Sequence, residues 1–361
     1  MCKRFHGGER FEKGPNEMTR RLRFRLIALA AAAAIAAVAA TLGAARARAG
    51  TIGTGIVVVD TALGYEGASA EGTGLVLTPG GEVLTNNHVI RGATTIRVVV
   101  PGTGKRYAAR VVGYDVGDDV AVLQLKGASN LRTVSAGSAA VRVGQAVTAT
   151  GNAGGTGSLT TVKGVVTGLR KSIVAGDGQG DSEQLTGLIE TNAAVVAGDS
   201  GGALLDSGGH VIGMLTAAST SNQFSFQQAA ASDAYAIPVA KALSIAHTIT
   251  RGTTTAAVHV GGTAFLGVSI ATAGQDGFGF GDVSQSGAVV TGVAGTSPAG
   301  RAGLQAGDVI VRLDGRAVAS ADALRTRLLA KRPGQKVTIG YVDQFGASQS
   351  VTVTLASGPP Q

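Results

Sequence analysis

Short apolar runs alternate with glycine-rich breaks over most of the chain. From Gly55 to about Ile249 these runs are rich in β-branched residues and are separated by turn residues. Runs of roughly 4–8 residues at this spacing are typical of an all-β sandwich or barrel, and not of alternating strands and helices. The expected strands include Ile56–Val59, Gly74–Leu77, Ile96–Val100, Ala108–Tyr114, Val120–Leu125, Ala146–Thr150, Val162–Leu169 and Val211–Leu215.

Two longer stretches and one helical segment interrupt this pattern. Lys171–Gly187 and Ala217–Asp233 are rich in Gly, Ser and Gln, and we interpret them as long loops of the kind that often carry function. Val239–Thr250 predicts a short closing helix, and a second unit follows with short strands and an amphipathic helix near Ala321–Lys331. The expected organisation is a leader over residues 1–49, a first domain over 50–250, a linker over 251–262 and a second domain over 263–357.

Composition supports this picture and removes several classes of function. Of 361 residues, 56 are glycine, which suits many turns. The formal charge is +8, but residues 1–49 carry +7 of it, so the folded part lacks the basic footprint of a nucleic-acid-binding protein. The single cysteine, Cys2, lies in the leader, which excludes a disulfide framework, a cysteine-ligated zinc and a cysteine nucleophile from the folded part.

The leader has the layout of an export segment. Four arginines between Arg20 and Arg25 precede an uncharged run, residues 26–45, which is followed by Ala47-Arg48-Ala49. That order is typical of a secretory signal cleaved after Ala49. The run is also long enough to span a bilayer, so a retained membrane anchor stays open as the alternative. Either reading places the rest of the chain outside the cytoplasm.

Three short motifs carry candidate chemistry. His88 follows an apolar strand in the motif Thr85–Ile90, Asp119 precedes the strand Val120–Leu125, and Ser200 lies within Gly198-Asp199-Ser200-Gly201-Gly202. A serine hydroxyl becomes a nucleophile when an imidazole takes its proton and a buried carboxylate orients that imidazole. Flanking glycines allow the N–H groups of Gly198 and Ser200 to converge as an oxyanion hole.

Each motif alone has an ordinary structural explanation, so their order decides the interpretation. Gly198–Gly202 also fits the nucleophile elbow of an α/β hydrolase, but that fold needs its acid and histidine after the serine and a helix directly behind it. Here a strand, a turn at Asp206–Gly209 and another strand follow. The order His, Asp, Ser on an all-β chain favours the chymotrypsin-like arrangement.

At these residues the chain resembles the HtrA/Deg serine proteases. The similarity rests on Thr85–Ile90, Asp119–Leu123, Glu190–Leu205 and Ala236–Val239. It implies a chymotrypsin-like double β-barrel with His88 as general base, Asp119 as orienting acid and Ser200 as nucleophile. Asp119 is preferred over Asp118 because it directly precedes the apolar strand, as the acid of the family does. Asp199 departs from the asparagine usual in the family and needs a buried partner.

The residues shortly before the serine predict the specificity. Ala194, Val195, Val196 and Ala197 form the bottom of the primary pocket in a chymotrypsin-like site. None of them is a carboxylate that could pair with a Lys or Arg side chain. We therefore expect cleavage after small or medium aliphatic residues.

The second unit resembles a PDZ domain. The likeness rests on Phe265-Leu266-Gly267-Val268, on Ser297–Ile310 and on Asp314-Gly315. In such a domain the loop N–H groups of Leu266, Gly267 and Val268 hold a peptide carboxylate, and the strand from Val268 pairs with the peptide. The leucines of the following helix serve as core residues, as pocket residues or as both. The expected peptide-binding residues are Phe265, Leu266, Gly267, Val268, Leu324 and Leu328.

These features together predict a serine endopeptidase of the cell envelope that degrades unfolded or misfolded exported proteins. Its expected partners are unfolded polypeptides and peptide C-termini, and it needs neither a metal nor a cofactor. The resemblance implies a homo-oligomer, commonly a trimer in the family, and a PDZ domain that signals to the protease through residues 171–187 and 217–233. A non-proteolytic chaperone or peptide-binding scaffold is the alternative from another class, and an α/β-hydrolase esterase is a third.

Overall fold

The computed structural model describes residues 53–65, 67–176, 182–220, 223–225, 233–272 and 286–361. The predicted export segment, including the apolar run 26–45, lies outside the described residues. The described residues all belong to one compact unit, residues 53–361. Within the described ranges, no helix combines the length and the apolar character needed to cross a bilayer.

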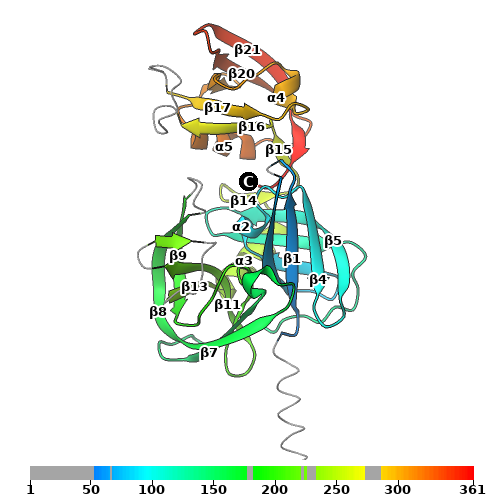
Figure 1. Ribbon diagram of the computed structural model, residues 1–361, viewed down its shortest axis with the longest axis vertical. Helices are drawn as coiled ribbons and strands as arrows, with labels where there is room; N and C mark the ends of the chain where they lie inside the picture. Colours follow the sequence, from blue (N-terminus) through cyan, green and yellow to red (C-terminus); the bar gives the residue numbers. More distant parts are fainter. Residues whose placement is uncertain (1–52, 66, 177–181, 221–222, 226–232, 273–285) are drawn as a thin grey trace, which may run out of the picture. The chain divides into compact units, whose positions relative to one another are not determined.

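The first seven-stranded sheet closes on itself as a barrel. Its strands follow the order β14-β5-β4-β1-β2-β3-β6, and a further pairing of β5 with β6 closes it (Figure 1). The bounds are β1 Ile56–Leu63, β2 Ala68–Val76, β3 Glu82–Thr85, β4 Thr95–Val100, β5 Lys105–Asp115, β6 Val120–Leu125 and β14 Val258–Val260. Strand β14 comes from the stretch predicted to be a linker, and it pairs with β5 through Val258 and Asp115.

A second seven-stranded sheet forms the other barrel. Its order is β10-β7-β8-β12-β11-β13-β9, and the additional pairings β10–β11 and β8–β9 curl it round. The bounds are β7 Ala146–Gly151, β8 Thr160–Gly176, β9 Ser182–Thr191, β10 Ala203–Leu205, β11 Val211–Thr220, β12 Gln223–Ser225 and β13 Asp233–Pro238. The all-β prediction and all eight expected strands are confirmed.

The stretches predicted as long loops are largely strands. Residues 171–176 continue β8, and residues 182–187 begin β9, which pairs with it from Gly176 and Ser182 onward. Likewise β11 extends to Thr220, and β12 lies within the second stretch. The loop prediction was wrong here because it weighed the Gly, Ser and Gln content and overlooked alternation, in which Ile173 and Ala175 are buried while Val174 is exposed.

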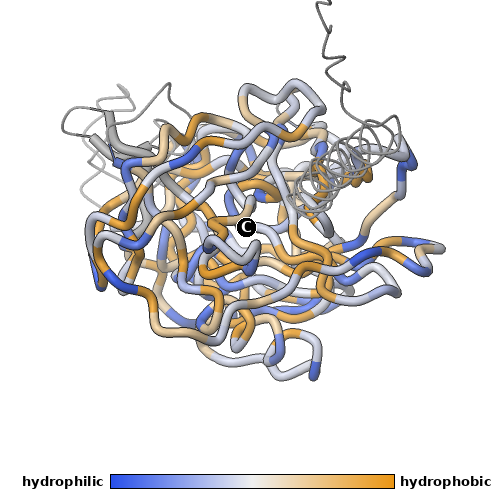
Figure 2. The backbone as a smooth tube through the Cα atoms, turned by 90° about the horizontal axis from the view of Figure 1, so that it is seen from below, coloured by the Kyte–Doolittle hydropathy of each residue, from blue (hydrophilic) through white to orange (hydrophobic). Residues whose placement is uncertain are grey.

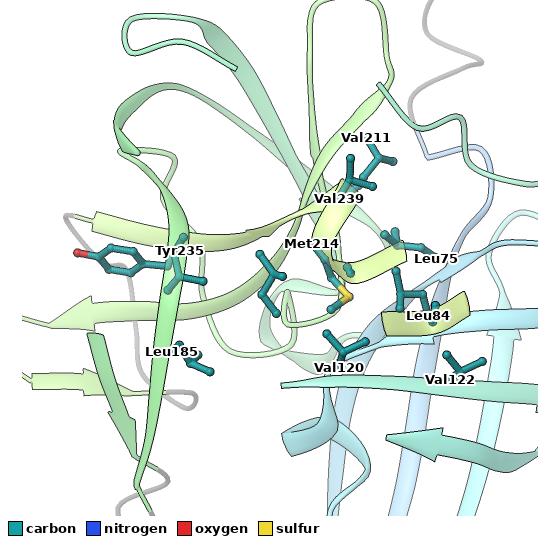
Figure 3. Packing of buried hydrophobic residues seen from close by; sticks show 14 of the residues in the cluster. Leu75, Leu84, Val120, Val122, Leu185, Val211, Met214, Tyr235 and Val239 are labelled. Atoms are coloured by element: carbon teal, nitrogen blue, oxygen red, sulfur yellow. The ribbon is translucent and has the colours of Figure 1, made fainter. Parts of the chain in front are cut away.

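One hydrophobic cluster is shared by the two barrels. It joins Leu75, Leu84 and Val120 of the first barrel to Met214 and Ile237 of the second (Figure 3). The helix α3, Val239–Thr250, as predicted, adds Val239, Ala242, Ala246 and Ile249 to the same cluster. Each barrel also has a cluster of its own. The strand ends that carry the candidate site therefore start from a common packed interior.

The C-terminal unit is a small sheet with two helices. The strands β16 Val268–Thr272, β17 Ala288–Val293, β18 Val309–Leu313, β20 Lys336–Val342 and β21 Ser348–Thr354 are neighbours in that order, and β19 Arg316–Ala317 pairs with β18. A second, two-stranded sheet contains β15 Thr263–Phe265 and β22 Ala356–Gly358. The helices are α4 Pro298–Arg301 and α5 Ala321–Leu329. Figure 2 shows how hydrophobic and hydrophilic stretches alternate along the traced backbone.

Candidate active site

His88 and Asp119 are paired. The chain leaves β3 at Thr85 and begins the short helix α2, Asn87–Ile90, so His88 is its second residue. Asp119 lies in the turn before β6 with φ +52°, a left-handed conformation that aspartate tolerates better than most residues. Nδ1 of His88 is 2.8 Å from Oδ2 of Asp119, and the main-chain N–H of His88 donates to Oδ1 at 2.9 Å. A hydrogen on Nδ1 leaves Nε2 able to accept a proton.

The carboxylate of Asp119 is completely buried and held from several sides. Thr216 on β11 donates its hydroxyl to Oδ2 at 2.5 Å, and Asn86 donates its side-chain amide to the main-chain oxygen of Asp119 at 2.9 Å. Asp118 instead forms an ion pair with Lys241 of α3 at 2.5 Å. Of the two adjacent acids, only Asp119 therefore contacts the histidine.

Ser200 lies in a loop whose shape depends on glycine. Gly198 and Gly201 have φ values of +93° and +81°, which side-chain-bearing residues rarely adopt. A Cβ at Gly198 would lie 2.1 Å from the carbonyl oxygen of Asn152, and one at Gly201 would lie 2.0 Å from that of Thr73. The loop is thus packed directly against backbone from elsewhere in the fold.

The hydroxyl of Ser200 donates to the main-chain oxygen of Thr216 at 3.2 Å. Thr216 therefore contacts two members of the predicted set, Asp119 through its side chain and Ser200 through its carbonyl. The side chain of His88 is 9% exposed and Ser200 is 8% exposed. The three motifs, dozens of residues apart, are thus linked through Thr216 on β11: His88 follows β3, Asp119 precedes β6 and Ser200 precedes β10.

The two predicted oxyanion donors are available. In the part of the chain that the structure describes, the N–H groups of Gly198 and Ser200 donate no hydrogen bond. Such free, fixed main-chain donors are what a tetrahedral oxyanion requires. The Ser200 carbonyl, by contrast, accepts from the N–H of Thr73 at 2.8 Å.

Asp199 finds a main-chain partner and no cation. Its side chain turns inward, is 4% exposed, and accepts a hydrogen bond from the N–H of Val196 at 3.0 Å. No ion pair reaches it from the residues with described positions. Burial raises the pKa of Asp199 to about 6, although the Val196 bond acts in the opposite direction.

The four residues predicted for the primary pocket have different surroundings. Ala194 is exposed, while Val196 and Ala197 are half-buried beside the serine loop. Val195 is 4% exposed and packs into the core of the second barrel. The side chain of Val195 therefore packs in this core and does not face the serine loop. The reason is that successive side chains of an extended segment point to opposite sides.

The predicted peptide-binding residues of the second unit surround one edge of its sheet. Among the strands that the structure describes, β16, from Val268, lies at the edge of the sheet with β17 as its neighbour. Gly267 has φ +84°, and its carbonyl accepts bonds from the Ser297 hydroxyl and the Ala294 N–H, each at 3.1 Å. Leu266 is 2% exposed, within the core, and its carbonyl accepts from the N–H of Ala299.

The two helix leucines differ. Leu324 is completely buried in the core of the second unit, whereas Leu328 is partly buried against it. Phe265 ends β15 and is half-buried. Leu324 is thus a core residue, and its predicted part in peptide binding stays a prediction.

Several site residues escaped the sequence analysis. Thr216, Asn86, Thr73 and Asn152 are each at most 1% exposed. The first three bond to Asp119 or to the loop around Ser200, and the N–H of Asn152 donates to the Thr73 hydroxyl. A polar residue at the end of an apolar strand, as at Thr216, is the available signal. It indicates a buried hydrogen bond without identifying the partner.

Comparison with known proteins divides the chain in the same way. Residues 72–214 match the family described as trypsin-like peptidase domain, and residues 264–355 match the PDZ domain family. The serine protease PepD of Mycobacterium tuberculosis is 32% identical over 312 residues, which are 83% of this chain and 63% of that protein. The periplasmic pH-dependent serine endoprotease DegQ of Escherichia coli is 34% identical over 292 residues, or 79% of this chain and 59% of DegQ.

The chain thus spans about three fifths of the length of these relatives. A solved structure described as HtrA-type protease AlgW with tripeptide is 28% identical, covers 87% of this chain and 97% of that chain, and has a TM-score of 0.49.

Proposed function

Because the chain belongs to the HtrA/Deg type of serine protease, with a trypsin-like peptidase domain followed by a PDZ domain, we propose that it is an endopeptidase for unfolded exported proteins. The observation that supports the proposal is that Thr216 bonds both to the carboxylate paired with His88 and to the Ser200 hydroxyl, in a loop where two N–H groups donate to no described acceptor. A purely structural role would not require a buried His–Asp pair, a serine hydroxyl and unbonded main-chain N–H groups in the same site.

The chemistry is acyl transfer by way of an acyl-enzyme. Oγ of Ser200 attacks the scissile carbonyl while Nε2 of His88 takes its proton, and Asp119 stabilises the imidazolium. The N–H groups of Gly198 and Ser200 receive the oxyanion. His88 then protonates the leaving amine, and water repeats the sequence to release the acid. The Ser200 hydroxyl, which donates to Thr216, must rotate toward His88 at the start of the reaction.

We further propose cleavage after small or medium aliphatic residues. Ala194, Val196 and Ala197 offer no negative charge near the serine loop, and the nearby carboxyl group of Asp199 is directed inward to the Val196 N–H. A Lys or Arg side chain would therefore lose its hydration without gaining a partner.

The open edge of β16 and the turn at Gly267 support binding of an extended peptide C-terminus by strand addition. We propose Leu328, with Val268, as part of its side-chain pocket, since Leu324 is already committed to the core. The names of the relatives support an extracytoplasmic location. Export through residues 1–49, attachment by residues 26–45 and assembly as a trimer remain proposals of the same kind.

The test is hydrolysis of casein by the full chain and by Ser200→Ala. We expect the variant to lose at least about a thousandfold in rate, because no other hydroxyl can form the acyl-enzyme. A fluorophosphonate probe should label only the unaltered protein, and mass spectrometry of the casein fragments should find Ala, Val or similar residues before the cut bonds.

Two results would contradict the proposal. Equal hydrolysis by both proteins would remove Ser200 from the reaction. No hydrolysis and no labelling of the unaltered chain would favour the non-proteolytic peptide-binding scaffold. Cleavage mainly after Lys or Arg would refute the specificity alone.

A further inference from the structure

The two peptide planes that carry the proposed oxyanion donors are both held by main-chain groups. The carbonyl of Ala197 accepts from the N–H of Gly154 at 2.7 Å, and the carbonyl of Asp199 accepts from the N–H of Gly202 at 2.8 Å. Because a peptide group is planar and trans, fixing one carbonyl also fixes the N–H of the next residue on its opposite side. The first bond thus orients the N–H of Gly198, and the second orients that of the serine.

The plane between them is held at both of its polar groups. At one end, the N–H of Asp199 donates to the carbonyl of Val196 at 3.1 Å. At the other end, the carbonyl is held by a side chain. Thr73, on β2 of the first barrel, donates its hydroxyl to the carbonyl of Gly198 at 2.7 Å. This is the only one of the three carbonyl bonds that a substitution can remove without altering the backbone. The middle plane joins the other two, so its rotation changes the direction of both donors.

The direction of the Thr73 hydroxyl is determined by its neighbours. Its oxygen accepts from the N–H of Asn152 at 2.9 Å, and since that group can only donate, the hydroxyl hydrogen is left for the carbonyl of Gly198. Thr73 is completely buried, its own N–H donates to the carbonyl of Ser200, and its carbonyl accepts from the hydroxyl of Thr85 at 2.7 Å. All four polar groups of the residue therefore have partners.

Released from this bond, the Gly198 carbonyl has a poor alternative. Glycine at φ +93° has no side chain to limit rotation of the plane. A buried carbonyl without a donor costs free energy, which favours turning the plane toward another donor. Only the bond from the Asp199 N–H to the Val196 carbonyl, among those of the described residues, then opposes that rotation. A rotation that brings the carbonyl toward the oxyanion position places a partial negative charge where the reaction develops one.

We propose that Thr73 is a positioning residue for the oxyanion hole, in which one hydroxyl group of the first barrel fixes the serine loop of the second. The inference rests on the proposed protease function and extends it to a residue that does not touch the substrate. Because Thr73 would act on stabilisation of the transition state, the proposal predicts that its loss lowers kcat and changes KM little.

The test compares three variants of the full chain. Thr73→Val removes the hydroxyl at nearly constant shape, and Thr73→Ser keeps it. Thr61→Val is the matched control, because Thr61 is likewise a buried threonine of the first barrel, 3% exposed, and donates to a main-chain oxygen, that of Ala70 on β2 at 2.9 Å. Each is assayed for kcat and KM on a peptide with alanine before the cut bond, and for affinity to a peptide boronic acid, whose adduct places an oxyanion in the hole.

For Thr73→Val we expect kcat to fall about 10- to 100-fold, somewhat less than for direct loss of a donor, with KM changed less than about twofold. Affinity for the boronic acid should fall by a similar factor. Thr73→Ser should stay within about threefold of the unaltered chain. Thr61→Val should lower the thermal midpoint as much as Thr73→Val does and leave kcat and boronic acid affinity unchanged.

The proposal is overturned if Thr73→Val matches Thr61→Val in kcat and in boronic acid affinity, or if Thr73→Ser is as impaired as Thr73→Val. Failure of the protease function is a separate result, since the unaltered chain would then cleave nothing. In that event a crystal structure of Thr73→Val decides the inference: an unmoved Gly198–Asp199 peptide plane refutes it, and a rotated plane supports it.

Discussion

At the scale of single residues, Asp199 carries a buried carboxyl group next to the proposed nucleophile, Ser200. Among the described residues, its side chain has one hydrogen-bond partner, a main-chain N–H. The sequence showed that it needed a partner, and the structure identifies the Val196 N–H. One neutral donor does not offset the loss of water around a carboxylate, which is why burial raises the pKa of Asp199 to about 6. The folded protein thus holds the proton on this group more tightly than the unfolded chain does.

This pKa predicts an unusual pH dependence of stability. For a carboxyl group whose pKa is raised on folding, the stabilising effect is complete below its unfolded pKa near 3.8 and is lost as the pH rises through about 6. Asparagine does not ionise, so Asp199→Asn should gain stability relative to the unaltered chain between pH 5 and pH 8, by roughly 1–2 kcal/mol. Urea unfolding at the two pH values measures the change.

Asp206→Asn is the control with the opposite sign. Although burial would raise the pKa of Asp206, hydrogen bonds from the N–H groups of His210 and Gly208 lower it. Its contribution is therefore lost as the pH falls. A difference for Asp199→Asn that is constant with pH would contradict the assignment.

The sequence suggested His88, Asp119 and Ser200 as the catalytic residues because the proposed chemistry depends on residue type and order. It did not locate Thr216 or Thr73, since threonine is common in strands for reasons of shape alone. What distinguishes these two is the position of a hydroxyl relative to residues more than ninety positions away. Only the closed barrels define that position. The burial of Val195 escaped prediction for the same reason.

At the scale of elements, strand positions followed from the apolar pattern, but their ends did not. The pairing of β8 with β9 extends as far as Gly176 and Ser182, well beyond the last β-branched cluster of the predicted strand at Leu169. Once two strands are paired, each further residue gains main-chain hydrogen bonds, and composition then matters less. The short helix α2 was missed because four residues are too few to produce a helical period.

Met214 on β11 tests the packing between the elements. It is completely buried in the cluster shared by the two barrels, between Leu75, Leu84 and Val239 (Figure 3). Met214→Ala should lower the free energy of unfolding of the double barrel by about 2–5 kcal/mol, because the cavity can collapse only partly. Urea dependence of fluorophosphonate labelling at Ser200 reports this unfolding specifically.

Met214→Leu, which preserves most of the volume, should cost less than about 1.5 kcal/mol. If Met214→Ala left the urea midpoint of labelling unchanged, the shared cluster would not be contributing to the stability of the site.

At the scale of the whole molecule, the edge strand β16 predicts that activity responds to peptides. A peptide with a free C-terminal carboxylate and an aliphatic last residue should bind and raise the rate of casein hydrolysis by the full chain, at least about twofold. The same peptide with a C-terminal amide should bind at least about tenfold more weakly, because the turn at Gly267 offers N–H donors to a negative charge.

Isothermal calorimetry gives the two affinities, and casein hydrolysis gives the response. Equal binding of acid and amide would exclude recognition of the terminal carboxylate. Binding of the acid without any change in rate would confine the second unit to substrate capture.

A protease for unfolded polypeptides, as proposed for this chain, can itself be cleaved by neighbouring copies whenever one of its segments unfolds locally. The apolar interior built jointly by β2, β3 and β6 on one side and β11, β13 and α3 on the other limits this danger. Neither barrel can unfold without removing apolar contacts from the other. Partly unfolded forms, which are cleaved most easily, should therefore be scarce. The side chains of this shared interior thereby also protect the protein from cleavage by other copies of itself.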